Sequence, residues 1–284
     1  MKFALKSLAV AASAFVAVGA AQAASQTLAV GGTLSGTDTT GTTWNLHDLS
    51  GSGTLSFSSL LISALNTAAV KITEVSPATL NAPTSTTTSG AVKYISASAA
   101  APITSLTGTF DGSTLTVEQV ATAGGATQTT IKNGATSGPG SLVINNLNVD
   151  LTTKTVYADI NGANGVGVQN HFALWTYTNL TGPTSFSVPS TATETPFTVT
   201  NTLTGLFASQ ASMDMFAKSL NLNSIGISAL KSVNDPTKGG GAGFGSITST
   251  ISVIATPAVP EPSTYALMGL GLVGMSLVAR RRAR

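Results

Sequence analysis

Between residues 25 and 255 the chain alternates short apolar or β-branched runs with clusters of Gly, Asn, Pro, Ser and Thr. Apolar residues at every second position are the pattern of half-buried antiparallel strands. The pattern predicts strands over 53–60, 92–96, 114–120, 142–151, 155–160, 172–178, 197–204 and 246–254. No repeat of fixed period accompanies them, which argues against a solenoid or a propeller.

The clearest predicted hairpin covers 142–160, with its turn at 152–154. Residues of one parity on each strand should point into the core. These inward side chains are predicted to be Val143, Leu147, Val149 and Leu151 on the first strand, and Val156, Ala158 and Ile160 on the second.

Three segments break the strand pattern, because their apolar residues recur at helical spacing over 60–68, 213–220 and 225–233. The Ser/Thr-rich segment 81–90 and the Gly-rich segment 235–245 are expected to be loops. The fold class predicted for residues 24–255 is therefore all-β, an antiparallel β-sandwich-like body with two or three short helices.

The N-terminal segment has the three parts of a secretory signal peptide. Lys2 and Lys6 precede an apolar run over 8–18, and Ala21, Ala23 and Ala24 supply a small-residue site for signal peptidase. We expect residues 1–23 to be removed and the remaining chain to be exported across the inner membrane.

The C-terminal segment also divides into three parts, which follow a Pro-rich linker predicted over 256–262. Val259, Pro260, Glu261 and Pro262 come first, and an apolar run over 265–279 follows. The chain then closes with a basic cluster of Arg280, Arg281, Arg282 and Arg284. The sequence predicts a single C-terminal transmembrane helix with the arginines in the cytoplasm and the body outside.

Segment 259–284 resembles the PEP-CTERM sorting signal of Gram-negative bacteria, which also joins a Pro-Glu-Pro motif, a short apolar helix and a basic end. The resemblance implies recognition by an exosortase, a membrane-embedded transpeptidase-like enzyme that is thought to cut near the motif. The same segment is also labelled an ice-binding protein C-terminal domain. The body, in contrast, resembles no family.

Charge and composition narrow the function classes further. The formal net charge is +2, yet every arginine lies in the C-terminal segment, and the body holds seven lysines against ten acidic residues. A body of about −3 offers no basic patch for nucleic acid. The chain has no cysteine, which excludes disulfides and cysteine-ligated metal sites. Thr (44) and Ser (33) dominate the polar residues.

No pattern in the body selects a catalytic or metal-binding residue, and no cofactor is expected. His47 and His171 belong to no G-x-S-x-G or H-E-x-x-H motif. Asp111, and Asp150 with Asp159, do not match a calcium loop, so they are interpreted as turn and strand-end residues.

The sequence therefore predicts a non-enzymatic surface or extracellular-matrix protein, associated with exopolysaccharide or biofilm. Two alternatives stay open. One is a carbohydrate- or ice-binding module that uses Thr-x-Thr pairs such as Thr198/Thr200, and the other is a secreted hydrolase. The expected partners are signal peptidase, exosortase, the inner membrane and exopolysaccharide.

Overall fold

The computed structural model describes residues 24–88, 90–188, 195–258 and 267–273. Strands dominate the fold, and their bounds are β1 Gln26–Ala29, β2 Leu34–Thr37, β3 Thr43–Phe57, β4 Lys71–Val75, β5 Thr79–Asn81, β6 Thr84–Thr86, β7 Val92–Tyr94, β8 Ser98–Phe110, β9 Thr114–Thr122, β10 Gly125–Thr130, β11 Gly140–Asp150, β12 Thr155–Gly162, β13 Gly167–Thr181, β14 Ser185–Ser187, β15 Thr195–Ala208 and β16 Gly245–Pro257. The helices of the body are α1 Ser59–Thr67, α2 Gln210–Ser219, α3 Ser224–Val233 and a 3-10 turn, η1, at Gly239–Gly241, and residues 267–273 are also helical.

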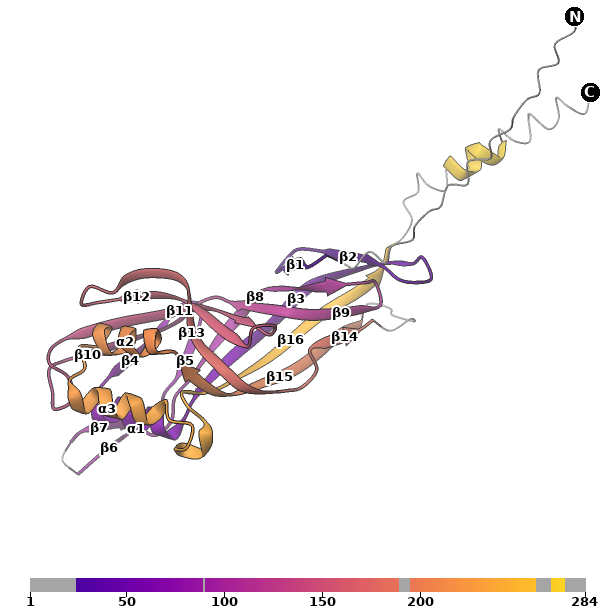
Figure 1. Ribbon diagram of the computed structural model, residues 1–284. Coiled ribbons are helices and arrows are strands. Elements are labelled where there is room, and N and C mark those ends of the chain that lie inside the picture. Colours follow the sequence, from indigo (N-terminus) through magenta and orange to yellow (C-terminus); the bar gives the residue numbers. More distant parts are fainter. Residues whose placement is uncertain (1–23, 89, 189–194, 259–266, 274–284) are drawn as a thin grey trace, which may run out of the picture.

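Fourteen of these strands form one antiparallel sheet that curls and closes on itself (Figure 1). Eight strands complete the circuit in the order β9-β8-β3-β16-β15-β13-β12-β11, and β11 then pairs with β9. The other six strands of the sheet pair with members of this circuit or with each other: β1 and β5 pair with β8, β2 with β3, β14 with β9, and β10 with both β11 and β4. Closure leaves the eight strands with paired neighbours along much of their length, which protects backbone groups that an open sheet edge would expose.

Closure depends on a change of partner within β11. The first half of this strand pairs with β10, and from Asn148 onward it pairs with β9. Between the two halves lies a bulge at which Asn146 adopts a φ of 52°. Asn146 exchanges backbone and side-chain hydrogen bonds with Gly124, at 2.9 and 3.2 Å. The bulge therefore ties β11 to the turn between β9 and β10.

The three α-helices begin at polar residues that satisfy otherwise unpaired backbone N–H groups. The Ser58 hydroxyl accepts from the Leu61 N–H, the Ser209 hydroxyl accepts from the Ser212 N–H, and the Asn223 side chain caps α3 in the same way. Their apolar faces pack against one end of the sheet, where β4 and β10 also lie (Figure 1).

The interior holds three apolar clusters, all within residues 28–255. The largest lies between α2, α3 and strands β11, β12, β13, β15 and β16, and it includes Trp175, Phe216 and Phe244. A second cluster fills the opposite end of the sheet around Trp44 and Phe110. The third lies beneath α1. The sheet and its core are thus complete within residues 24–258.

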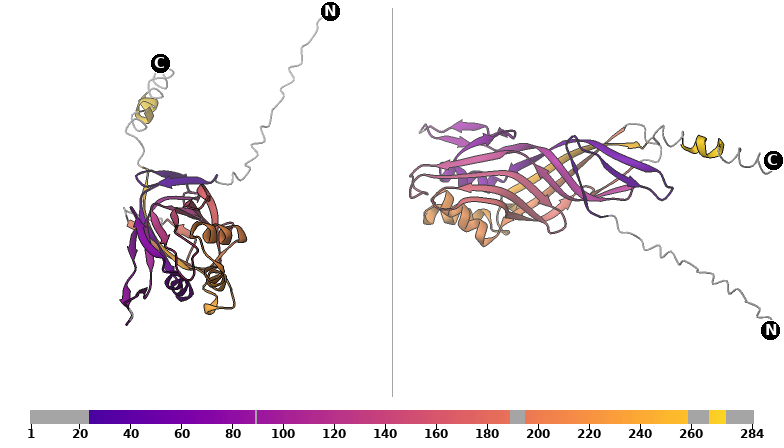
Figure 2. Two further views of the ribbon diagram at one scale, coloured as in Figure 1. Left: turned by 90° about the vertical axis from the view of Figure 1, so that its left-hand side faces the viewer. Right: turned by 90° about the horizontal axis from the view of Figure 1, so that it is seen from above.

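The body has two distinct ends, which the side view in Figure 2 shows clearly. Strand β16 begins opposite Phe57, just before α1, and ends opposite Trp44. At about 3.3 Å per residue its 13 residues span roughly 40 Å. The helices therefore lie at the end of the body far from the point where the chain leaves β16.

The all-β prediction and the three helical segments are confirmed. One continuous closed sheet takes the place of the two facing sheets expected of a sandwich. The predicted loop at 81–90 contains the short strand β6, which pairs with β7 just after the loop. Leu142 and Ile144, rather than Val143, point inward, because the bulge at Asn146 reverses the parity of β11.

Candidate functional site

The C-terminal segment leaves the body directly from a central strand. β16 continues to Pro257, and the Ala258 N–H still donates to the Thr43 carbonyl at 2.8 Å. The sequence placed Thr256 and Pro257 in a linker, whereas the structure includes both in the sheet. The Pro-Glu-Pro motif therefore begins two residues after the last of these backbone hydrogen bonds, with little chain between the motif and the folded body.

Most of the predicted processing residues lie outside the described residues. These are the cleavage-site residues 21 and 23, the motif residues 259–262 and the arginines at 280–282 and 284. Ala24 is the first described residue and is exposed. Residues 267–273 are helical, and none of the helices in the described ranges is both long and apolar enough to cross a bilayer.

A second feature is a regular grid of hydroxyl groups on the outer side of β15, β16 and β3. We call it the hydroxyl face. Strand register places these side chains in four rows: Thr204, Ser246 and Ser56; Thr202, Thr248 and Thr54; Thr200, Thr250 and Ser52; and Thr198, Ser252 and Ser50. All twelve are exposed or half-buried.

In three of these rows, the hydroxyl of the β15 residue is hydrogen-bonded to the hydroxyl of the β16 residue. The two hydroxyl oxygens are 2.7 Å apart for Thr198 and Ser252, 3.3 Å apart for Thr200 and Thr250, and 3.2 Å apart for Thr202 and Thr248. Sheet geometry sets the repeat at about 4.8 Å between strands and about 6.8 Å along each strand. The result is an uncharged, ordered array that offers hydrogen-bond donors and acceptors to a partner with a matching repeat.

The sequence pointed to Thr198 and Thr200 but missed most of the face. Its three strands come from 50–56, 198–204 and 246–252, which share no fixed repeat along the chain. The available signal was a hydroxyl residue at every second position in each of these three strands. That signal becomes a surface only through the register of β15, β16 and β3.

Residues 258–282 match the family model of the PEP-CTERM protein-sorting motif. The chain carries a PEP-CTERM motif. Neither a curated protein nor a solved structure matches the chain. The motif marks an exosortase-sorted protein, destined for the cell envelope or the extracellular space, with exosortase as its processing partner.

His47 lies beside the strand end that leads into the PEP-CTERM motif. Its Nδ1 is 3.0 Å from Asp48 Oδ2, and its Nε2 is 3.3 Å from the Thr256 hydroxyl. An acid, an imidazole and a hydroxyl in this order resemble a catalytic triad. However, Asp48 is 68% exposed, so solvent screens its interaction with the imidazole. The absence of a catalytic role for His47 stays a prediction.

His171 lies on β13, far along the chain from His47, and its contacts hold the local structure of the sheet together. Its ring stacks on Tyr157, with centroids 4.1 Å apart and planes 7° apart. Its backbone N–H donates to Asp159 Oδ1 at 2.9 Å, and Asp159 Oδ2 accepts from Asn146 Nδ2 at 3.0 Å. Asp159 thus connects the stacked histidine to the bulge in β11.

Two of the acidic residues considered as metal ligands, Asp111 and Asp150, each stabilise a turn, whereas Asp159 lies within β12. Asp111 accepts from the backbone N–H groups of Ser113 and Thr114. Burial alone would raise the pKa of Asp150, but hydrogen bonds from Thr152 and Thr153 outweigh it and lower that pKa. Within the described residues, no three His, Asp or Glu side chains gather in a way that could hold a metal ion.

Asp150 also affects a neighbouring tyrosine. Burial raises the pKa of Tyr177, and the negative charge of Asp150 raises it further. The Tyr177 hydroxyl donates to the Leu151 carbonyl at 3.4 Å, so it stays neutral and bonded to the turn after β11. This cluster stabilises the β11–β12 hairpin.

Proposed function

We propose that the protein is a non-enzymatic component of the cell surface or extracellular matrix, associated with exopolysaccharide. The observation that carries the proposal is the PEP-CTERM motif at 258–282, which follows a complete folded body without an intervening domain. Signal peptidase removes residues 1–23, and the apolar run over 265–279 holds the precursor in the inner membrane. Exosortase then acts near 260–262.

The hydroxyl face supports the contact with polysaccharide. Its twelve Ser and Thr side chains are uncharged, and the body as a whole is sparsely charged. Sugars present hydroxyl groups, which both donate and accept, and a hydroxyl side chain does the same. Removing a neutral surface from water on binding also costs less free energy than removing a surface of charged groups.

Deletion of the exosortase gene in the native host tests the sorting part of the proposal. The expected result is a precursor that is larger than the mature protein and stays in the membrane fraction. A chain of unchanged size and location in the deletion strain would contradict it. Binding of residues 24–258 to the host's purified exopolysaccharide, measured by co-sedimentation, tests the second part.

A second candidate function, ice binding, is favoured by the regularity of the same face. Ice recognition needs an ordered plane of hydroxyl groups, and the rows of β15, β16 and β3 supply one. Thermal hysteresis measured on residues 24–258 separates the candidates. A hysteresis gap that is lost in a Thr200→Val, Thr250→Val variant supports ice binding, and the absence of any gap excludes it.

A further inference from the structure

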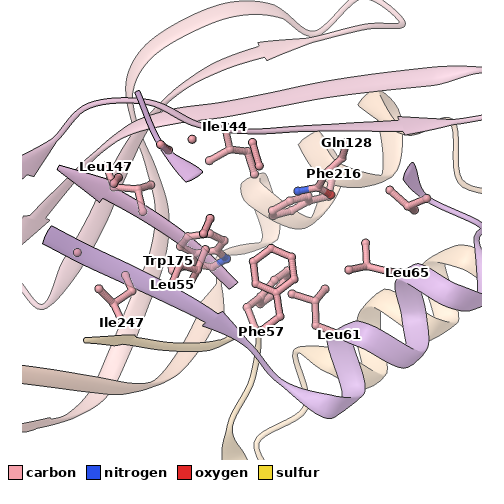
Figure 3. Close-up of a pocket in the computed structure, with 18 of the residues that line it drawn as sticks. Leu55, Phe57, Leu61, Leu65, Gln128, Ile144, Leu147, Trp175, Phe216 and Ile247 are labelled. Atoms are coloured by element: carbon pink, nitrogen blue, oxygen red, sulfur yellow. The ribbon is translucent and has the colours of Figure 1, made fainter. Parts of the chain in front are cut away.

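An apolar cavity of about 90 Å³ lies inside the body, at the end covered by the helices (Figure 3). Strands β3, β8, β9, β10, β11, β13 and β16 supply its walls, together with the inner faces of α1, α2 and α3. The largest side chains around it include Leu55, Phe57, Leu61, Trp175 and Phe216. It is separate from the hydroxyl face, which lies on the outer surface of the sheet.

The cavity exists because small residues stand at inward positions. Ten of its lining residues are Ala or Gly: Gly53, Ala64, Ala68, Ala78, Ala99, Ala101, Gly124, Gly125, Ala126 and Gly226. Protein cores are normally packed to the density of organic crystals, so a void of this size forfeits stabilising contacts. A ligand that fills the void would restore those contacts.

Polar side chains interrupt the apolar lining at four positions, Thr122, Gln128, Trp175 and Ser249. Trp175 is 4% exposed, and in the described part of the chain its Nε1–H has no hydrogen-bond partner. Gln128 is 9% exposed and shares the cavity with Trp175. An unpartnered buried donor costs about 1–3 kcal/mol. Both groups line the same cavity, where a bound molecule would meet them (Figure 3).

We propose that this cavity binds a small, neutral, mostly apolar molecule that carries one hydrogen-bond acceptor, such as a short alkyl ketone or alcohol. The acceptor atom of the ligand accepts a hydrogen bond from the Trp175 indole N–H. The apolar part of the ligand packs against Phe57, Leu61 and Phe216. The described lining residues include no ionisable side chain, so a carboxylate or an ammonium would be buried without a counter-charge.

The cavity volume limits the size of the ligand. An engineered cavity of about 150 Å³ in another protein binds benzene. At about 90 Å³, this cavity suits a molecule of about four heavy atoms if the walls stay as they are. Acetone, with about four heavy atoms and one carbonyl, is therefore the probe, and isobutane, of the same size and shape, is the matched molecule without an acceptor.

The test is a ¹H–¹⁵N titration of residues 24–258 followed at the two indole N–H groups. Trp175 reports on the cavity, whereas Trp44, which donates to Asp38 at 3.1 Å in the other core cluster, is the internal control. Acetone should shift the Trp175 resonance saturably and leave Trp44 unchanged. Isobutane should bind roughly three- to tenfold more weakly, because it makes no hydrogen bond.

Two neighbouring alanines of β8 provide matched variants. Ala101 lines the cavity, and Ala100 beside it does not. Ala101→Leu should abolish binding of both probes, and Ala100→Leu should leave it intact. A second variant, Trp175→Phe, should equalise the affinities of the two probes in ligand-observed NMR. Absence of saturable binding, equal shifts at both tryptophans, or an unchanged preference in Trp175→Phe would overturn the proposal and leave a cavity that holds only water.

Discussion

Thr198 of β15 and Ser252 of β16 face each other on the outer surface of the sheet, with their hydroxyl oxygens 2.7 Å apart. The same relationship recurs in the next two rows, and β3 adds a third hydroxyl to each. Because these groups already hydrogen-bond to one another, they are held in fixed positions. Side chains that are already ordered lose less conformational entropy when a repeating partner binds.

The hydroxyl face should be needed for binding but not for folding. Thr200→Val with Thr250→Val removes two hydroxyls while keeping the β-branched shape. Exposed cross-strand pairs contribute about 0.2–1 kcal/mol, so the free energy of unfolding should fall by less than about 1 kcal/mol. Affinity for exopolysaccharide should fall by roughly thirtyfold, since two hydrogen bonds of about 1 kcal/mol each are lost.

The control for this variant uses a similar pair outside the face. Thr27 and Thr107 pair across β1 and β8, with hydroxyls 2.9 Å apart. Thr27→Val with Thr107→Val should leave co-sedimentation with the polysaccharide unchanged. Equal losses of affinity in both double variants would contradict a role for the face.

Asn146 should be replaceable by glycine but not by a β-branched residue. At a φ of 52°, a non-glycine side chain without a local hydrogen bond costs about 1–2 kcal/mol. Asn146→Val loses the side-chain bonds to Gly124 and Asp159 and adds strain, so it should destabilise the protein by about 2 kcal/mol or more in urea denaturation. Asn146→Gly loses the same bonds without the strain, and it should cost less than half as much.

Phe244 should contribute more to stability than its position in a Gly-rich segment suggests. Its side chain is 2% exposed and packs against Trp175 and Phe216, with ring centroids 5.7 and 5.3 Å away. Phe244→Ala should lower the free energy of unfolding by about 3–5 kcal/mol in chemical denaturation. Phe197→Ala, at a partly buried position in the other cluster, should cost clearly less.

The turn that begins at Asp38 should loosen in acid. The Thr40 hydroxyl, the Thr42 N–H and the Trp44 indole donate to this carboxylate and hold the pKa of Asp38 at about 2, below its ordinary value of 3.8. A lowered folded-state pKa stabilises the fold fully above about pH 4, and the contribution is lost as the pH falls through 2. The Trp44 indole resonance should therefore shift across this window.

Asp38→Asn provides the comparison, because an amide does not titrate. In that variant the Trp44 resonance should start at a different position and show no transition between pH 4 and pH 2. The Trp175 resonance, in the other cluster, should stay constant in both proteins. A Trp44 transition that persists in the variant would assign the pH effect to another group.

Local features of this fold could be predicted from the sequence, but pairings between distant segments could not. Period-two runs placed eight of the sixteen described strands, and helical spacing placed α1, α2 and α3, because both patterns depend on neighbouring residues. The strands that the sequence analysis missed include β8, which belongs to the closed circuit. Closure of the sheet depends on β9 meeting β11, and this in turn requires the bulge at Asn146. One residue in a left-handed conformation reversed the parity expected for Val143, and the apolar pattern carries no sign of it.

The candidate sites divide in the same way. The PEP-CTERM motif is contiguous and could be identified directly. The hydroxyl face and the cavity each collect residues from three or more separated segments, so only the register of the strands reveals them. The Ala and Gly residues that leave the cavity open, such as Ala101 and Gly226, look like ordinary small core residues in the sequence.

The most direct test of the sorting function is the intact mass of the mature protein from the native host. We expect a chain that begins at residue 24 or 25 and ends near residues 258–262, so that the apolar run and all four arginines are missing. A matched pair of variants locates the signal: Glu261→Ala should block processing, and Pro257→Ala, just outside the matched residues, should not. A mature chain that still ends at Arg284 would contradict exosortase processing.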